Sequence, residues 1–580
     1  MNKLIAYSEL ALRLEQHLNV IYPAYNPSDL VSRILDAFAI DESAPPIELY
    51  SDQWTQNDVM LITYGDSIKD KSSHPLECLY HFLQSNLQDS ITWVHILPFF
   101  PYSSDDGFSV IDYLKVNDSL GDWDDIRRFT ESYKVMADLV VNHISSRSQW
   151  FENFKSGKSP GKDYFIEVND EFDISQVVRP RKSPLLKAVQ TLTNKKHIWC
   201  TFSPDQIDLN FRNPDVLIEI IKIIALYLER GIKIFRLDAV AFLWKKSTSS
   251  CIHLQETHEI IKLFRTLMEY KAPESILITE TNVPNRENLT YFGNCNEAHL
   301  IYNFSLPPLL IYTLISGNCH QLKTWLMSMP PARMDTAYLN FIASHDGIGL
   351  RPVEGFLDEQ ELNILVNTMS SFGGRISSRA TENGVHKPYE INISLYDAFQ
   401  GTAQHGADRW QFARFICAHA IMIALEGVPA LYIHSVLGTQ NDYKKVENTN
   451  QYRSINRHCW QADELNQQLS DTASHHNKVL NEIKRLLEIR KQQPAFHPNA
   501  TQYTLHLGTK IFAFWRQSIN REQSIFSIHN ISDEKITIAL SDINLITTED
   551  WHDLITAEKI HESTISLDLA PYQTIWLSNC

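Results

Sequence analysis

The chain has 580 residues, which is too many for one compact core and predicts two or three domains, one of them large. Its 69 acidic and 52 basic residues give a formal net charge of −17, which argues against nucleic acid and anionic membrane surfaces as partners. An apolar fraction of 43% and a charged fraction of 21% are typical of a soluble globular protein.

The eight cysteines are scattered, without a CxxC pair or a spacing typical of metal ligands. In a chain of this size that pattern favours reduced thiols and a cytoplasmic location. The N-terminal stretch lacks the basic region and long apolar core of a signal peptide, and no apolar run is long enough to span a membrane. The sequence does not indicate an oligomeric state.

The first 50 residues predict a helical extension, because LIAYSELALRLEQHL and DLVSRILDAF repeat apolar residues at three- and four-residue spacing. Further on, short apolar runs alternate with helical stretches. Eight runs are strand candidates: 58–66, 91–100, 134–143, 235–240, 275–282, 298–307, 337–346 and 427–438. Strands that alternate with helices pair in parallel, so we predict a closed eight-stranded β/α barrel over residues 51–143 and 206–490.

Two connections are longer than a barrel requires. Residues 144–205, after the third strand, are polar and predict an inserted subdomain, and residues 347–426, after the seventh, are loop-rich. Both follow the C-terminal ends of strands, where barrels of this type carry their chemistry. After a helix at 478–494 the pattern changes to short β-type runs, which predict a separate antiparallel β-domain over residues 495–580.

Polar side chains end four of the predicted strands. They are Asn142 and His143 on the third, Arg236 and Asp238 on the fourth, Glu280 on the fifth, and His345 and Asp346 on the seventh. Each alone has a structural explanation, such as an ion pair, a turn residue, a helix cap or a buried histidine. Their joint position at one rim predicts a catalytic site, and Arg236 and Asp238, two residues apart, share a strand face.

Carboxylates at one rim suit glycosyl transfer, in which one attacks the anomeric carbon and another protonates the leaving oxygen. Asp238 is close to Arg236, and a neighbouring cation favours the ionised carboxylate that a nucleophile requires. Glu280 has no basic neighbour in sequence, so we expect a raised pKa and an acid/base role. Asp346 and the two histidines would then hold sugar hydroxyls.

Four motifs carry a family resemblance. DLVVNH (138–143), FRLDAV (235–240), ITETN (278–282) and ASHDG (343–347) resemble, in order, the four short signatures of the α-amylase superfamily of retaining glycoside-active enzymes. The resemblance implies that Asp238 is the nucleophile, Glu280 the acid/base and Asp346 the transition-state stabiliser. It also implies that Arg236, His143 and His345 contact the glucosyl group. Chemistry of this kind needs no cofactor or metal.

The stretches 96–116, 202–210 and 441–460 resemble the sucrose phosphorylase branch of that superfamily, and the resemblance covers roughly residues 55–580. It implies that Asp105 and Arg453 anchor glucose hydroxyls at the end of a one-unit pocket. Phe108 would form an apolar wall with Phe202 near it, although ordinary core packing is the alternative for both rings. Gln206 would line the acceptor side.

A phosphorylase of this branch transfers the glucosyl group to inorganic phosphate, its co-substrate, and therefore needs a basic group. The stretch VVRPRKSP (177–184) supplies Arg179, Arg181 and Lys182, for which a solvated charge run is the alternative. The branch has an RPR phosphate-binding loop, so the resemblance implies that Arg181 binds phosphate, with Tyr389 opposite. The planar guanidinium matches phosphate geometry.

The acceptor is predicted from departures within the branch. Glu390 stands where sucrose phosphorylases have a glutamine, which argues against fructose. The stretches YSSDDGFSVIDY, SHDGIGLRP and PYEIN resemble the glucosylglycerate phosphorylases. That implies that Arg351 and Lys387 pair with a glycerate carboxylate, unless both simply face solvent. The alternatives are a glucosylglycerol phosphorylase, then a sucrose or sucrose 6′-phosphate phosphorylase, a retaining α-glucosidase or transglucosidase, and a non-catalytic carbohydrate-binding protein.

Overall fold

The computed structural model describes residues 4–43, 45–48, 53–181, 183–380, 386–543, 550–561 and 564–580. Its centre is a closed barrel of eight parallel strands. These are β3 (Met60–Thr63), β5 (Trp93–Ile96), β6 (Lys134–Val140), β11 (Ile234–Asp238), β12 (Ile276–Thr279), β13 (Leu300–Tyr302), β14 (Ala337–Asn340) and β20 (Val428–Tyr432). Each of the eight predicted runs overlaps one of these strands, so the predicted barrel is confirmed.

The barrel strands are short and almost wholly apolar because both of their faces are covered. β3 and β12 are buried at every position. β11 pairs with β6 and β12, and its register places Arg236 beside Asp138. Since all eight strands run in the same direction, their C-terminal ends meet at one rim, and the polar residues that end them are brought together there.

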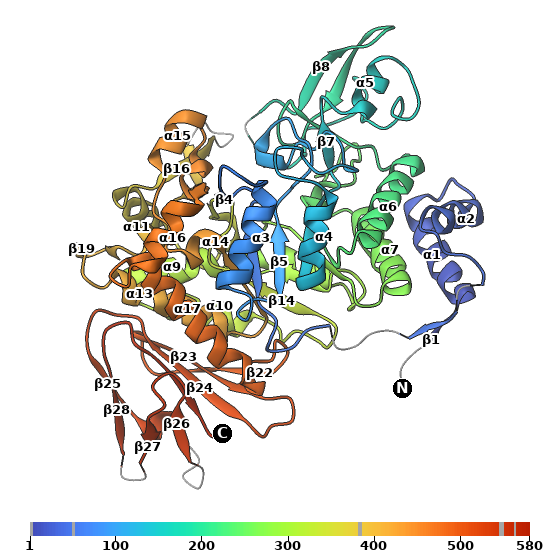
Figure 1. Ribbon diagram of the computed structural model, residues 1–580. Coiled ribbons are helices and arrows are strands. Elements are labelled where there is room, and N and C mark those ends of the chain that lie inside the picture. The colour runs from blue at the N-terminus through green and yellow to red at the C-terminus, as the bar shows by residue number, and fades with distance from the viewer. Residues whose placement is uncertain are drawn as a thin grey trace.

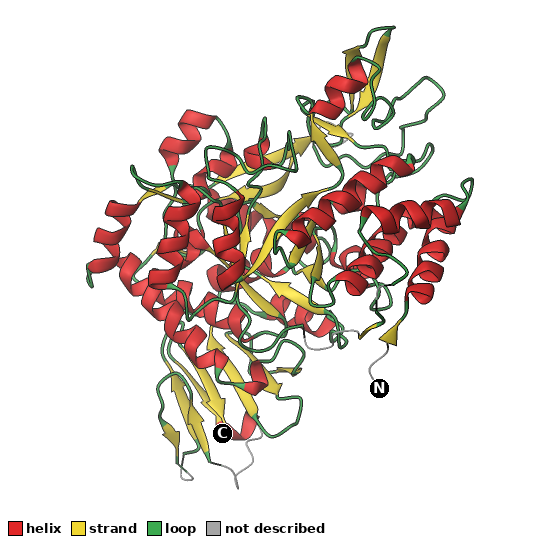
Figure 2. Ribbon diagram, turned by 45° about the vertical axis from the view of Figure 1, so that its right-hand side comes forward, coloured by secondary structure: helices red, strands yellow, loops and turns green. Residues whose placement is uncertain are grey.

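Helices surround the barrel (Figures 1 and 2). The long ones are α3 (Pro75–Asn86), α4 (Trp123–Ser132), α6 (Pro214–Glu229), α7 (Gln255–Lys271), α9 (Leu306–Ser316), α10 (His320–Ser328), α13 (Gln411–Ala424) and α17 (His475–Lys491). α6 shows why such a segment is helical: the Asn213 side chain caps the first turn, Pro214 follows it, and isoleucine and valine side chains face the strands.

The N-terminal extension contains the short strand β1 (Leu4–Ile5), the helices α1 (Tyr7–Ile21) and α2 (Pro27–Ala37), and β2 (Ile47–Glu48). Each helix overlaps one of the two apolar repeats of the sequence. α1 buries leucines at four-residue spacing, and the two helices pack on α7 and α6 at one side of the barrel (Figure 1).

The segment after β6 forms a small subdomain. It contains β7 (His143–Ser145), α5 (Gln149–Lys155), a hairpin of β8 (Leu186–Gln190) and β9 (Lys195–Trp199), and β10 (Gln206–Asp208). β10 pairs antiparallel with β7, which places Asp208 opposite His143. A separate small apolar cluster beneath the hairpin includes Ile166, Leu185 and Trp199.

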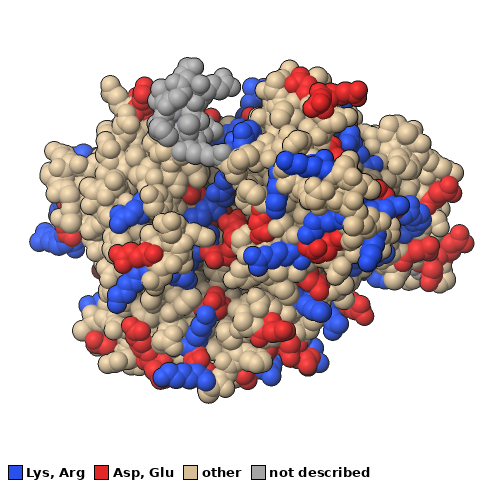
Figure 3. All heavy atoms as spheres, turned by 90° about the horizontal axis from the view of Figure 1, so that it is seen from above, with Lys and Arg blue, Asp and Glu red and all other residues tan. Residues whose placement is uncertain are grey.

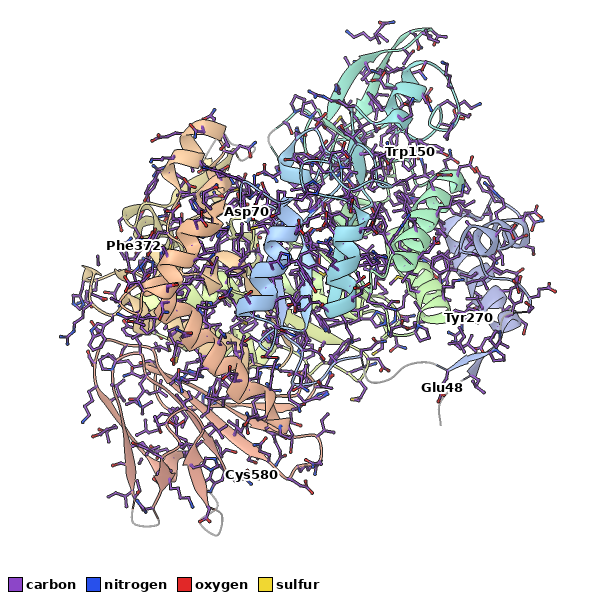
Figure 4. The ribbon with its side chains drawn as sticks, viewed as in Figure 1. Glu48, Asp70, Trp150, Tyr270, Phe372 and Cys580 are labelled. Atoms are coloured by element: carbon purple, nitrogen blue, oxygen red, sulfur yellow. The ribbon has the colours of Figure 1, made fainter. Side chains whose placement is uncertain are left out.

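The segment after β14 is more helical than the predicted loop-rich stretch. It holds β15 (Ile348–Gly349), α11 (Glu359–Ser371), β16 (Arg375–Ala380), β17 (His386–Asn392), α12 (Leu395–Ala398), β18 (Gly401–Thr402), β19 (Gly406–Ala407) and then α13. Trp150 of α5 and Phe372 at the end of α11 lie on either side of the upper part of the barrel in Figure 4. The two insertions therefore stand on different sides of the rim.

Short elements complete the barrel domain. They are β4 (Ile68–Lys69) paired with β21 (Trp460–Gln461), α8 (Asn285–Asn288), α14 (Ile433–Val436), α15 (Tyr443–Thr449) and α16 (Ala462–Ser470). Within the described residues, no helix has both the length and the apolar character needed to cross a membrane.

The C-terminal domain is antiparallel, as predicted. Six of its strands form one sheet in the order β22-β23-β24-β29-β26-β27, and β25 pairs with β28. Their bounds are β22 (Thr501–Leu505), β23 (Ile511–Gln517), β24 (Ser524–Asn530), β25 (Ile536–Ala539), β26 (Trp551–Asp553), β27 (Lys559–Ile560), β28 (Ser566–Leu569) and β29 (Thr574–Ser578). The domain lies at the opposite end of the barrel from the β8–β9 hairpin (Figure 1).

Candidate active site

A cavity of about 590 Å³ lies at the rim of the barrel. This volume is typical of a small-molecule site. Every residue to which the sequence analysis assigned a catalytic or binding role, except Arg236, lines it: Asp105, Phe108, His143, Arg181, Phe202, Gln206, Asp238, Glu280, His345, Asp346, Arg351, Lys387, Tyr389, Glu390 and Arg453. The fold thus gathers into one cavity side chains that are as much as 348 positions apart in sequence, from Asp105 to Arg453.

Arg236 lies behind the cavity lining, and its predicted contact with the glucosyl group stays a prediction. It is 3% exposed, and its Nη1 donates to Asp238 Oδ1 at 2.7 Å and to Asp138 Oδ1 at 2.5 Å. Asp138 in turn contacts His95 Nε2 at 2.7 Å. The Arg236 guanidinium bonds to both carboxylates, Asp138 inside the barrel and Asp238 at the cavity, and thereby orients Asp238.

Burial raises the pKa of Asp238, and the Arg236 guanidinium opposes that rise. Glu280 follows β12, and its Oε2 accepts the Ala239 backbone N–H at 3.1 Å. Burial also raises the pKa of Glu280, to about 7, against the lowering effect of Arg236 and with a further rise from Asp238. A protonated Glu280 beside a carboxylate backed by a cation is the arrangement that acid-assisted displacement requires.

Asp346 and Glu390 share Arg453. The Arg453 guanidinium donates to Asp346 Oδ1, and to Glu390 Oε1 through Nη2 at 2.5 Å and Nε at 3.1 Å. Burial acts to raise the pKa of Asp346, but Arg453, His345 and Arg457 bring it well below its usual range. Glu390 of β17 lines the cavity, yet its charge is committed to Arg453, which lies in a short helical turn after α15.

The closed end of the cavity joins an aromatic pair to a polar network. The rings of Phe108 and His345 stack with centroids 5.1 Å apart, and burial lowers the pKa of His345 to about 3, so its ring is neutral. Gln206 Nε2 contacts Asp105 Oδ2 at 3.1 Å and His143 Nε2 at 3.1 Å. Gln206 therefore bonds to groups predicted for the glucose end, and its predicted place on the acceptor side stays a prediction.

The mouth carries cations with a different character. Arg181, Arg351 and Lys387 line it, and the charged group of none of them has a hydrogen-bonding or ion-pair partner among the described residues. Burial acts to raise the pKa of Asp105, yet Arg181 leads the guanidinium groups that lower it overall, so the charge of Arg181 reaches the closed end. Figure 3 shows acidic and basic side chains interspersed over the face seen from above.

Of the predicted basic loop, Arg181 alone faces the cavity among the described residues. Arg179 is exposed and donates to the carbonyl of Ser183, and Lys182 lies outside the described residues. Tyr389 lines the cavity, and its backbone carbonyl accepts the N–H of Leu350, which holds β17 beside the loop that carries Arg351.

Sequence reasoning missed several groups. Asp138 begins the motif DLVVNH, and a buried aspartate in an apolar strand was a usable signal for it. Asp106 pairs with Arg457, whose Nε donates to the carbonyl of His345 at 2.7 Å. Asn282, the last residue of the motif ITETN, and the start of α11 also line the mouth. The described residues hold no group of three or more His, Cys, Asp and Glu that could bind a metal ion.

Comparison with known proteins gives consistent relatives. Residues 86–354 match the family described as Alpha amylase, catalytic domain. The chain is 38% identical to a glucosylglycerate phosphorylase from Allomeiothermus silvanus, over 98% of this chain and 99% of that protein. It is 30% identical to a glucosylglycerol phosphorylase from Marinobacter adhaerens, over 76% and 88% of the two chains.

A solved structure shares the fold. The crystal structure of a sucrose 6F-phosphate phosphorylase from Thermoanaerobacter thermosaccharolyticum superposes with a TM-score of 0.72 at 24% identity. The match covers 89% of this chain and 98% of that one. Barrel, insertions and C-terminal sheet therefore belong to one common architecture.

Proposed function

The chain belongs to the α-amylase superfamily, in the sucrose phosphorylase-like branch that includes glucosylglycerate phosphorylases, and from this premise we propose that it is a retaining α-glucoside phosphorylase. The proposed reaction is the reversible phosphorolysis of 2-O-α-D-glucosylglycerate to α-D-glucose 1-phosphate and D-glycerate. The observation that carries the proposal is a buried carboxylate pair, Asp238 and Glu280, facing a mouth with uncommitted cations.

Asp238 is the proposed nucleophile. Its carboxylate attacks the anomeric carbon while Glu280 donates a proton to the glycosidic oxygen, so the C–O bond breaks as the glucosyl–Asp238 ester forms. The ester has the β-configuration. Arg236 favours the ionised form of Asp238, and burial keeps the proton on Glu280 up to about pH 7.

Phosphate then displaces Asp238 from the same carbon, and ionised Glu280 accepts the proton of the incoming phosphate oxygen. Two inversions give α-D-glucose 1-phosphate with retained configuration. Asp346 stabilises positive charge that develops on the sugar ring, because Arg453 and Arg457 keep it ionised. Asp105, His143 and His345 hold the glucosyl hydroxyls next to Phe108.

Arg181 is the proposed phosphate ligand, with Tyr389 across the mouth. A guanidinium can donate two parallel hydrogen bonds to a phosphate dianion, and Arg181 has no competing described partner. Arg351 and Lys387 are proposed to pair with the glycerate carboxylate. Glu390 cannot supply acceptor specificity by its charge, since Arg453 neutralises it.

The reaction as proposed needs inorganic phosphate and no cofactor, because two carboxylates supply both the covalent and the proton-transfer steps. We expect full activity after exhaustive dialysis against a chelator. Restoration of lost activity by a divalent metal would contradict this part of the proposal.

The partners proposed are a small glucoside and phosphate, in the cytoplasm. All eight cysteines are free, which suits a reducing compartment. Fractionation of the native cells, with recovery of the protein in the cytosol or elsewhere, tests the location.

Reverse phosphorolysis tests the function directly. Glucose 1-phosphate is supplied with D-glycerate, glycerol, fructose or fructose 6-phosphate in separate reactions, and phosphate release is followed. The proposal expects a clear preference for D-glycerate. Preference for glycerol would replace it with a glucosylglycerol phosphorylase, a name borne by the relative at 30% identity. Phosphate release without an added acceptor would identify water as the acceptor, and so a hydrolase.

A further inference from the structure

Lys245 is a buried lysine that does not line the cavity. It follows the short turn after β11, and its side chain is 2% exposed. Its ammonium group contacts Asn142 Oδ1 at 2.7 Å, the carbonyl oxygen of Phe242 at 2.6 Å and Asp208 Oδ2 at 2.6 Å. The Lys245 ammonium therefore donates two hydrogen bonds, to Asn142 and Phe242, and forms an ion pair with Asp208.

Asp208 is the anion of this network and is 0% exposed. Its other contacts are the Thr201 backbone N–H at 2.7 Å, the Thr201 hydroxyl at 2.6 Å and Asn142 Nδ2 at 3.0 Å. Among the described residues, Lys245 is the only basic side chain paired with Asp208. The network therefore joins three chain segments: the end of β6, the segment from Thr201 to β10, and the turn after β11.

Each of those segments also carries a residue that lines the cavity. Asn142 precedes His143, Thr201 precedes Phe202, Asp208 lies two residues after Gln206 in β10, and Phe242 is itself a lining residue. The four lining side chains form a continuous row in space, in the order Gln206, His143, Phe202 and Phe242. The His143 and Phe202 rings lie 5.2 Å apart, those of Phe202 and Phe242 lie 5.5 Å apart, and Gln206 contacts His143 at 3.1 Å.

We propose that Lys245 is a positioning residue for catalysis: its ammonium holds these three segments together and thereby sets the cavity wall formed by His143, Phe202, Gln206 and Phe242. A neutral side chain at this position would leave the Asp208 carboxylate buried and uncompensated, and the segments would separate or admit water. The inference rests on the proposed function only in requiring glucosyl transfer at Asp238.

The chain provides a matched control. Lys323 of α10 is also buried, at 8% exposure, and its ammonium donates to the Gly508 carbonyl at 2.6 Å, beside the C-terminal domain and away from the cavity lining. Lys323→Ala thus removes a buried ammonium that has no link to the wall. A merely structural role for Lys245 predicts similar behaviour of the two variants.

The experiment measures kcat/KM for α-D-glucosyl fluoride by fluoride release, which needs a donor site and no particular acceptor. We expect Lys245→Ala to lose on the order of 10²-fold, because small misplacements of substrate-positioning groups have effects of that size. Lys323→Ala should keep the wild-type value. Ammonium chloride should restore at least part of the Lys245→Ala loss in a saturable way, since NH₄⁺ fits the vacated position. Tetramethylammonium chloride at equal ionic strength should not.

The double variant Lys245→Met with Asp208→Asn removes both charges and guards against loss of folding in the single variant. It should fold, show reduced kcat/KM and be insensitive to ammonium. Wild-type kcat/KM in the double variant, or a folded Lys245→Ala protein that lacks activity and ignores ammonium, would overturn the inference. Formation of glucose 1-phosphate by the wild-type protein, measured in parallel, tests the proposed function separately.

Discussion

The closed end of the cavity and its mouth differ in how their charges are compensated. At the closed end three carboxylates are ion-paired with guanidinium groups: Asp238 pairs with Arg236, and Asp346 and Glu390 share Arg453. At the mouth, the guanidinium groups of Arg181 and Arg351 have no hydrogen-bonded or ion-paired partner among the described residues. The closed end is therefore organised before any ligand binds, whereas the mouth keeps its positive charge for one.

This difference follows from burial. An unpaired buried charge is strongly unfavourable, so the ionised carboxylates of the closed end are paired, whereas burial raises the pKa of Glu280 and favours its protonated form. The partly exposed cations at the mouth remain hydrated, so they need no partner in the protein and are free to bind an anionic ligand. The division matches the two halves of the proposed reaction, because the glucosyl group is neutral while phosphate and glycerate are anions. The predictions below test whether the two ends are independent in this way.

The largest expected effect is at the closed end, from Asp238→Asn. Loss of the nucleophile should lower kcat on the order of 10⁴-fold or more, and no glucosyl–enzyme should be detected by mass spectrometry. Asp70→Asn, at an exposed residue outside the cavity lining, is the control and should leave kcat unchanged. A trapped glucosyl ester in the Asp238→Asn protein would place the nucleophile elsewhere.

Glu280→Gln should lower the rate by about 10²- to 10⁴-fold and alter the pH profile. Because the pKa of Glu280 is raised to about 7, its acid form is present below that pH and is lost as the pH rises through it. The wild-type glucosylation rate should therefore fall on the alkaline side of about pH 7, and the variant should lack this limb. An unchanged alkaline limb in Glu280→Gln would assign the titration to another group.

At the mouth, Arg181→Ala should raise KM for phosphate by about 10- to 100-fold, the range expected for charge-assisted hydrogen bonds. A slow hydrolysis of the glucosyl–enzyme should remain, because the closed end is intact. Arg179→Ala is the matched control, since Arg179 is exposed and turned to the Ser183 carbonyl. An equal rise in KM for phosphate in the two variants would show that phosphate binding depends only on the net charge of the loop, without a specific contact to Arg181.

The smallest effects are expected for Arg351→Ala and Lys387→Ala. Each should raise KM for D-glycerate by about two- to five-fold, as for partly exposed ion pairs, and leave KM for glycerol unchanged. Added salt should weaken glycerate binding in the wild type for the same reason. Parallel changes with glycerate and glycerol would mean that these cations shape the mouth without contacting the carboxylate.

Much of this architecture could be predicted from local patterns. The eight barrel strands are apolar runs whose spacing with helices permits few arrangements, and the polar residues that end them must meet at one rim. The shared face of Arg236 and Asp238 follows from their two-residue spacing alone. The helix α11 was missed among glycines and loops, although the capping box of Asp358 and Glu361 is a local signal for its start.

Local sequence patterns could not predict which charged side chains form ion pairs with one another. The pairing of Arg236 with Asp138 depends on the register of β11 and β6, and that of Glu390 with Arg453 spans 63 positions. Glu280 has no basic neighbour in sequence, yet Arg236 lies close enough to lower its pKa, and burial prevails. The sequence by itself thus determined the barrel and the kinds of group at its rim. Only the tertiary structure decided their pairing and burial, because electrostatic energies depend on distance and dielectric surroundings rather than on order along the chain.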